Sequence, residues 1–187
     1  FLEFSNDYHP GTLQKFLTQD LFCYANLPYR IKGYEDQLKD PHNTIDYDDD
    51  TEVLIDQRVE EVGADGRLIW NNKGEVYNVN LTEKLLATVL AKLSNLIPEG
   101  GIWMNTQRPE WNDANNALVG FGVSMVTLYY TRRLQQYLLE LFSSVDFEEV
   151  AVSEEIAELL HAIHSTFENH KHLLAGKFSD TDRKQVL

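Results

Sequence analysis

Apolar residues recur at intervals of three and four along three segments of the chain, and this periodicity constrains the fold more than any other feature. The segments cover residues 82–96, 113–142 and 153–170, with residue 114 as an alternative start of the second. Side chains at this spacing share one face of an α-helix. In the first segment the apolar positions are Leu85, Leu86, Val89, Leu90, Leu93 and Leu96. The sequence therefore predicts three amphipathic helices.

Residues at the ends of these segments support the predicted boundaries. Thr82 and Ser153 are candidate N-cap residues, because a side-chain oxygen there can accept a hydrogen bond from a free backbone N–H. Pro98 and the pair Gly100-Gly101 end the first helix. The connection between the second and third helices is short, so we expect these two helices to pack as an antiparallel hairpin.

The other segments predict shorter elements. Thr12 begins a predicted short helix, and a last helix is predicted to begin near Ser179. Residues 1–10 and 24–47 are expected to be irregular, the latter because they contain prolines and a glycine. Residues 51–62 fit a helical face, but their β-branched side chains favour a strand, so both remain open.

A turn-forming sequence lies between two strand-like segments. Residues 67–70 and 75–79 are rich in apolar and aromatic side chains, and residues 71–74 (Asn-Asn-Lys-Gly) supply turn chemistry. This arrangement is typical of a β-hairpin. The predicted fold class is therefore mainly α, built from antiparallel helical hairpins with one small β-hairpin around residues 67–79.

The length of 187 residues and the 43% hydrophobic content allow a substantial buried core. We expect residues 1–187 to form a single helical domain or a fragment of a larger one. Because the chain begins with Phe1, we also expect it to be a processed or excised part of a parent chain, which would then be one of its partners.

Several localisations and partners are disfavoured by the sequence. No apolar run approaches the ~18 residues of a membrane span, so no membrane partner is expected. The sequence contains no signal-peptide pattern, and the single cysteine, Cys23, cannot form an internal disulfide, so a cytoplasmic location is favoured.

The chain is acidic, with a formal net charge of −14. This charge argues against a nucleic-acid partner, because phosphate binding requires clustered Lys and Arg. Residues 35–65 hold twelve acidic and two basic residues and so supply most of the charge. Within them, residues 46–52 suggest a calcium loop, a solvated loop that caps the next helix, or a border of a ligand cleft, and the capping loop is preferred.

The segment 105–116 gathers polar and charged side chains around a tryptophan, directly before the predicted helix 113–142. One interpretation is a helix-capping cluster, with Asn112 or Asp113 as the N-cap and Trp111 packed beneath it. The other is a sugar site, in which Trp111 offers a flat apolar face to a pyranose ring and polar side chains bind its hydroxyls. A carboxylic acid such as Asp113 would then protonate the glycosidic oxygen.

The sequence Glu110-Trp111-Asn112-Asp113 resembles the Asp-Trp-Asn-Asp motif of the inverting disaccharide phosphorylases related to cellobiose phosphorylase. The resemblance implies that Asp113 is the general acid and that Trp111 and Asn112 shape the sugar pocket. Glu110 stands in place of the first aspartate of the motif and is the second candidate catalytic residue. After the motif this chain has Ala114-Asn115, where the family usually has a Gly-Met or similar pair.

The resemblance also implies a fold and a reaction. That family has an (α/α)6 toroid, and at about 12 residues per helix and about 5 per connection its twelve helices need at least roughly 200 residues. The chain would then supply about half of the toroid. The implied substrate is a disaccharide or oligosaccharide, cleaved by phosphorolysis or hydrolysis. No cofactor or metal is implied, and inorganic phosphate would be the co-substrate of a phosphorylase.

Further candidate binding residues flank the motif or lie elsewhere in the sequence. Arg108 is the base nearest to the motif, Trp103 offers a second aromatic face, and Asn115 follows the motif. His9 lies in an aromatic loop and is a candidate substrate contact, although an ordinary loop contact is preferred. His161 lies three residues before a second histidine, His164, but no cysteine or carboxylate set completes a zinc site. The alternative function is a non-catalytic helical module that binds carbohydrate or protein.

Overall fold

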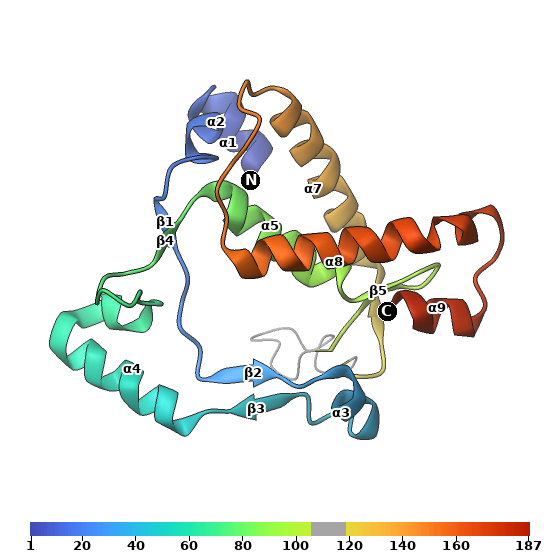
Figure 1. Ribbon diagram of the computed structural model, residues 1–187, viewed down its shortest axis with the longest axis horizontal. Helices are drawn as coiled ribbons and strands as arrows, with labels where there is room; N and C mark the ends of the chain where they lie inside the picture. Colours follow the sequence, from blue (N-terminus) through green and yellow to red (C-terminus); the bar gives the residue numbers. More distant parts are fainter. Residues whose placement is uncertain (106–118) are drawn as a thin grey trace. The chain divides into compact units, whose positions relative to one another are not determined.

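The computed structural model describes residues 1–105 and 119–187 and shows a mainly helical chain with small antiparallel sheets (Figure 1). The mainly α prediction is confirmed. The chain forms two compact units. Unit 1 comprises Phe1–Leu21, Val79–Trp103 and Val123–Leu187, and unit 2 comprises Phe22–Asn78 and Met104–Gly122.

Unit 1 contains most of the described helices. They are α1 (Leu2–Tyr8), α2 (Thr12–Phe16), α5 (Leu81–Leu93), α7 (Met125–Ser143), α8 (Glu154–His170), the 3-10 helix η2 (Lys171–Ala175) and α9 (Asp180–Val186). A three-stranded antiparallel sheet consists of β5 (Leu96–Ile97), β6 (Gly101–Trp103) and β7 (Val123–Ser124), with β6 in the centre. Because α5 contacts α2, α7 and α8, it is the central helix of this unit.

The core of unit 1 joins these helices to the sheet. Leu17, which follows α2, Leu90 of α5 and Ile102 of β6 are its most deeply buried apolar side chains. Leu138 and Leu141 of α7 are also buried. Burial of one such side chain contributes about 1.5–3 kcal/mol relative to its exposure to water. The apolar periodicity of the sequence therefore found the face of α5 that meets this core, where Val89 and Leu90 are buried.

The first predicted helix begins two residues earlier than the sequence suggested. Asn80, not Thr82, is the N-cap of α5, and its side-chain oxygen accepts a hydrogen bond of 3.0 Å from the N–H of Glu83. The hydroxyl of Thr82 instead donates to the carbonyl of Leu17 at 2.8 Å. This buried bond connects the start of α5 to the end of α2. Asn80 therefore caps α5, whereas Thr82 joins α5 to another segment.

The second predicted helix is shorter than the apolar pattern suggested. α7 begins at Met125, where Ser124 caps it by accepting from the N–H of Thr127 at 3.1 Å. A continuous helix from residue 113 or 114 to 142 is therefore wrong, because residues 119–121 form a turn and β7 pairs with β6. Gly120 adopts the left-handed conformation with φ of 79°. The part of the prediction at 113–118 lies outside the described residues.

The third predicted helix is confirmed, since α8 begins after Ser153 and ends at His170. Its packing differs from the prediction, because α8 packs mainly against α5 rather than forming an antiparallel hairpin with α7 (Figure 1). The last predicted helix is confirmed as α9, which starts with a capping box between Ser179 and Asp182. Residues 2–8 were expected to be irregular and instead form α1.

Unit 2 contains the acidic stretch. β2 (Tyr29–Ile31) pairs antiparallel with β3 (Ile45–Tyr47), and α3 (Tyr34–Lys39) lies in their connection, so the expectation that residues 24–47 are irregular is wrong. α4 (Asp49–Val62) follows and is continued by the 3-10 helix η1 (Gly63–Arg67). The ambiguous segment 51–62 is therefore helical. β1 (Phe22–Cys23) and β4 (Asn78–Val79) are the remaining short strands.

The predicted β-hairpin is present in a minimal form. Trp70 and Val76 form an antiparallel bridge. The N–H of Asn71 donates to the carbonyl of Glu75 at 2.8 Å, and the N–H of Tyr77 donates to the carbonyl of Ile69 at the same distance. The side-chain oxygen of Asn71 also accepts from the N–H of Glu75, which closes the turn. The turn residues 71–74 therefore predicted the position of the β-hairpin correctly.

The acidic residues before α4 act at its N-terminus. Asp48 is the N-cap, and its carboxylate accepts from the N–H of Thr51 at 2.9 Å and from the Thr51 hydroxyl at 2.8 Å. These hydrogen bonds lower the pKa of Asp48 below its usual value, the backbone bond having the larger effect. Asp49, Asp50 and Glu52 occupy the first turn, where the helix dipole favours negative charge. This arrangement is the expected capping loop.

Candidate functional site

Six of the eight residues of the predicted sugar site lie outside the described residues. They are Arg108, Glu110, Trp111, Asn112, Asp113 and Asn115. The two described members are Trp103 and His9. We call residues 105–116, which contain the motif, the motif segment. The structure describes the residues that precede and follow this segment.

The strands β6 and β7 flank the motif segment in unit 1. Ile102 pairs with Ser124 and Trp103 pairs with Val123, and both pairs are antiparallel. Partners across such a pair have Cα atoms about 4.5–5.5 Å apart. The chain therefore leaves β6 and returns to β7 at nearly the same place, so the motif segment is part of the connection between two paired strands.

In unit 2, the residues nearest to the motif segment are also joined. The N–H of Met104 donates to the carbonyl of Gly122 at 3.0 Å, and the N–H of Gly120 donates to the carbonyl of Met104 at 2.7 Å. Gly120 has a positive φ, and a Cβ atom at this position would overlap the backbone of Pro41. Gly120 allows a turn and a close approach to Pro41.

Trp103 and His9 have different surroundings. Trp103 is the last residue of β6, is partly exposed, and donates its N–H to the carbonyl of Asn95 at 2.8 Å. His9 is exposed and follows α1, and its carbonyl accepts from the N–H of Thr12 at 3.1 Å. Trp103 thus lies at the entrance to the motif segment, whereas the backbone of His9 closes the turn between α1 and α2.

A buried polar cluster, which the sequence did not predict, fixes the start of α8 against α5. Glu83 is 3% exposed, and its carboxylate accepts from the N–H of Ser153 at 2.7 Å and from the Ser153 hydroxyl at 3.0 Å. The side-chain amide of Asn80 donates to the carbonyl of Ala151 at 2.6 Å. The sequence offered one signal, because Glu83 lies three residues before Leu86 and seven before Leu90, on the apolar face of the helix.

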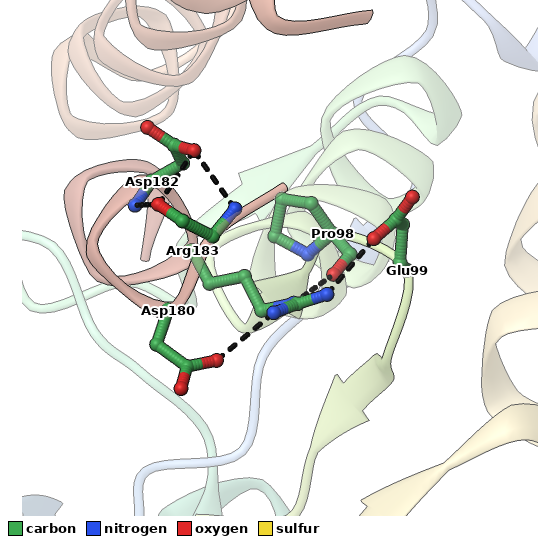
Figure 2. Close-up of polar contacts among 6 residues, drawn as sticks. Pro98, Glu99, Asp180, Asp182 and Arg183 are labelled. Atoms are coloured by element: carbon green, nitrogen blue, oxygen red, sulfur yellow. Dashed lines mark hydrogen bonds and ion pairs between the residues drawn. The ribbon is translucent and has the colours of Figure 1, made fainter. Parts of the chain in front are cut away.

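The sheet that flanks the motif segment is attached to α9 through Arg183, as Figure 2 shows. The guanidinium of Arg183 donates to the carbonyl of Pro98 at 3.1 Å and to the carboxylates of Glu99 and Asp180 at 2.8 and 2.9 Å. Glu99 lies between β5 and β6 and has a φ of 58°, which is uncommon for a residue with a side chain. Arg183 therefore stabilises a strained turn in this sheet.

Two grooves lie on the surface of unit 1, away from the two described candidate residues. A groove of about 580 Å³ is lined by Glu3 and the exposed face of α7. A mostly apolar groove of about 480 Å³ is lined by residues between Leu96 and Glu99 and between Phe167 and Val186. Neither groove is lined by Trp103 or His9.

The described residues contain no group of three His, Cys, Asp or Glu side chains that could hold a metal ion. Among the helices that the structure describes, none has both the length and the apolar character needed to cross a lipid bilayer. No protein-family model matches the chain, and no curated protein matches it. The resemblance to the disaccharide phosphorylases therefore depends on the motif residues themselves.

Proposed function

We propose that the chain is part of an enzyme that cleaves glycosidic bonds with inversion, and that Asp113 is its general acid. The observation that carries this proposal is the sequence Glu110-Trp111-Asn112-Asp113, which combines a flat aromatic side chain, an amide and two carboxyl groups. An aromatic face and hydrogen-bonding side chains suit a sugar ring, and a carboxylic acid suits protonation of the leaving oxygen.

The proposed reaction needs one acid and one nucleophile. Asp113 gives its proton to the glycosidic oxygen as the bond to the anomeric carbon breaks. In phosphorolysis, the phosphate anion attacks that carbon from the opposite face and needs no general base. In hydrolysis, a carboxylate must remove a proton from the attacking water. Arg108 is the residue of the motif segment that suits a phosphate anion.

The flanks of the motif segment support the proposal. Catalytic side chains act from loops that a rigid scaffold positions. Here β6 and β7 are paired, and Ile102 in the centre of the sheet is 2% exposed. Arg183 links the same sheet to α9. In the proposed (α/α)6 toroid, α5, α7 and α8 are helices of the barrel and the motif segment is one of its catalytic loops.

An assay of the full-length protein that contains this chain tests the proposal. The protein is incubated with a panel of disaccharides, with and without inorganic phosphate, and the products and their anomeric configuration are followed by NMR. Release of a sugar 1-phosphate only with phosphate identifies a phosphorylase, and release of free sugar without phosphate identifies a hydrolase. Inverted configuration at the anomeric carbon supports either form of the proposal.

The alternative function, a non-catalytic module, predicts a different outcome of the same experiment. A module that only binds sugars gives saturable chemical-shift changes with a disaccharide and no product. A module that binds proteins gives neither. Either result contradicts the catalytic proposal.

A further inference from the structure

The face of α7 that points away from the core has an unusual number of exposed apolar side chains. Tyr129 and Leu139 are both 64% exposed, and Met125 is 44% exposed. Single exposed apolar residues are ordinary, but a group on one helix marks an interaction site. The spacing of Met125, Tyr129 and Leu139 places them on the same side of the helix as Arg132 and Gln136.

These positions follow the spacing of a helix–helix seam. Met125, Tyr129, Arg132, Gln136 and Leu139 are separated by four, three, four and three residues. Alternating steps of three and four keep side chains facing a single partner helix, as in a coiled coil. The buried residues of α7, including Leu138 and Leu141, lie on the opposite side of the helix.

Two charged side chains without an ion-pair partner among the described residues make the two ends of this face differ in charge. Arg132 and Glu140 are both exposed, and within the described part of the chain neither forms a salt bridge. They are eight residues apart, about 12 Å along the helix, and so cannot pair with each other in one molecule. Gln136 lies midway between them and donates to the carboxylate of Glu140 at 2.9 Å. The face is thus positive at one end and negative at the other.

A neighbouring pair of charges is already satisfied. Arg133 forms an ion pair with Glu3 of α1, and this contact raises the pKa of the Arg133 guanidinium. The groove of about 580 Å³ lies beside this pair and is lined by Tyr129, Arg132, Gln136 and Glu140. The groove follows the same face of α7. Its lining therefore combines the exposed ring of Tyr129 with the charged side chains of Arg132 and Glu140.

We propose that this face of α7 is a self-association surface whose partner is a second copy of the chain. A two-fold axis at Gln136 places Arg132 of each copy opposite Glu140 of the other, because both residues are four positions from the axis. The two α7 helices are antiparallel and cross at about 20°, which keeps both ion pairs within reach. In a two-fold interface each contact occurs twice, so one complementary pair of residues supplies two ion pairs.

The same arrangement covers the apolar side chains. Tyr129 of one copy lies about one helical turn from Leu139 of the other along the helix axis, and the two Gln136 side chains meet at the two-fold axis. Burial of the apolar side chains then stabilises the dimer, and the ion pairs fix the antiparallel direction of the two helices. A parallel arrangement places Arg132 against Arg132 and is disfavoured.

Charge reversal tests this surface directly. Sedimentation velocity on the full-length protein that contains this chain, from about 1 μM to about 500 μM, measures dimerisation of the wild type, Arg132→Glu, Glu140→Arg and the double variant. Each single reversal replaces two attractions by two repulsions and weakens dimerisation by at least about tenfold. The double variant regains the dimer. An equimolar mixture of the two single variants also forms a dimer, because both 132–140 contacts of the mixed dimer are then attractive.

A matched control separates the surface from a general effect of charge. Lys92→Glu makes the same change of charge at an exposed position of α5 and leaves dimerisation unchanged. Circular dichroism verifies that each variant keeps the helical content of the wild type. A wild-type monomer over the whole range overturns the proposal. So do single variants that dimerise like the wild type, or folded single variants whose mixture stays monomeric.

Discussion

The carboxylate of Glu83, in the first turn of α5, binds both the backbone N–H and the hydroxyl of Ser153, seventy residues further along the chain. Ser153 is the N-cap of α8, but its own side chain does not cap that helix. Glu83 supplies the negative charge in its place, at the positive end of the α8 dipole. One buried carboxylate therefore stabilises the start of α8 and fixes it against α5.

Replacement of Glu83 should destabilise unit 1 more than replacement of its partner. Glu83→Ala leaves the Ser153 N–H buried without an acceptor, and we expect a loss of about 2–3 kcal/mol in the free energy of unfolding. Ser153→Ala removes only the hydroxyl and should cost about 1 kcal/mol. Urea denaturation of both variants and of the double variant measures the coupling. If the two losses simply add, the bond between the Ser153 hydroxyl and the Glu83 carboxylate does not stabilise the fold.

Asn80 offers a test that separates a helix cap from a contact with another segment. Asn80→Asp keeps the oxygen that caps α5 but replaces the amide that donates to the carbonyl of Ala151. We expect Asn80→Asp to lower the free energy of unfolding by about 1–3 kcal/mol, because two acceptors then face each other. Asp and Asn are equally good N-caps, so capping alone predicts no change. Chemical denaturation distinguishes the two results.

Gly120 and Gly74 form a matched pair for backbone strain. Both have positive φ, 79° and 77°, but a Cβ would overlap the backbone of Pro41 only at Gly120, whereas Gly74 has open space. Gly74→Ala should cost about 1 kcal/mol for the left-handed backbone, and Gly120→Ala about 1–3 kcal/mol more for the overlap. Thermal unfolding of the two variants gives the difference. Equal losses would mean that Pro41 does not lie against Gly120.

The lowered pKa of Asp48 predicts how the stability of α4 depends on pH. Hydrogen bonds from Thr51, the backbone bond first, favour the ionised carboxyl. The stabilisation is therefore complete above the ordinary pKa of about 4 and is lost as the pH falls through the lowered value. The wild type should melt at a higher temperature than Asp48→Ala at about pH 7, and this advantage should shrink toward about pH 2.

Asp48→Asn is the control for that experiment. Its side chain caps the helix without titrating, so its advantage over Asp48→Ala should be the same at both pH values. A wild-type advantage that does not change with pH would show that the charge of Asp48 has no role in the cap.

The sequence predicted helices best where both ends are marked by local chemistry. α9 begins after Ser179, as expected, because its capping box needs only the near neighbour Asp182. The β-hairpin was found for the same reason, since the turn at Asn71 to Gly74 is a local structure. α8 also begins after Ser153, but the distant carboxylate of Glu83 holds its start, and the Ser153 side chain does not cap it. The cap of α5 was misplaced because the hydroxyl of Thr82 is used by the distant carbonyl of Leu17.

The sequence failed where distant backbone pairs determine the structure. Apolar residues continue through 117–128, so periodicity favours one helix, but pairing of Val123 with Trp103 makes part of that segment a strand. The close approach of Gly120 to Pro41 has no local signal either. The candidate site is known through Trp103 and the strands beside the motif segment, and the role of Asp113 remains a prediction.

The most direct test of the proposed function compares two leaving groups. Asp113→Asn should lower the rate of disaccharide cleavage by the full-length protein about 10²–10⁴-fold, as expected for loss of a general acid. A glycosyl fluoride or a dinitrophenyl glycoside needs no protonation of its leaving group, so the same variant should cleave it at nearly the wild-type rate. Equal losses on both substrates, or full activity on the disaccharide, would contradict the assignment of Asp113 as the acid.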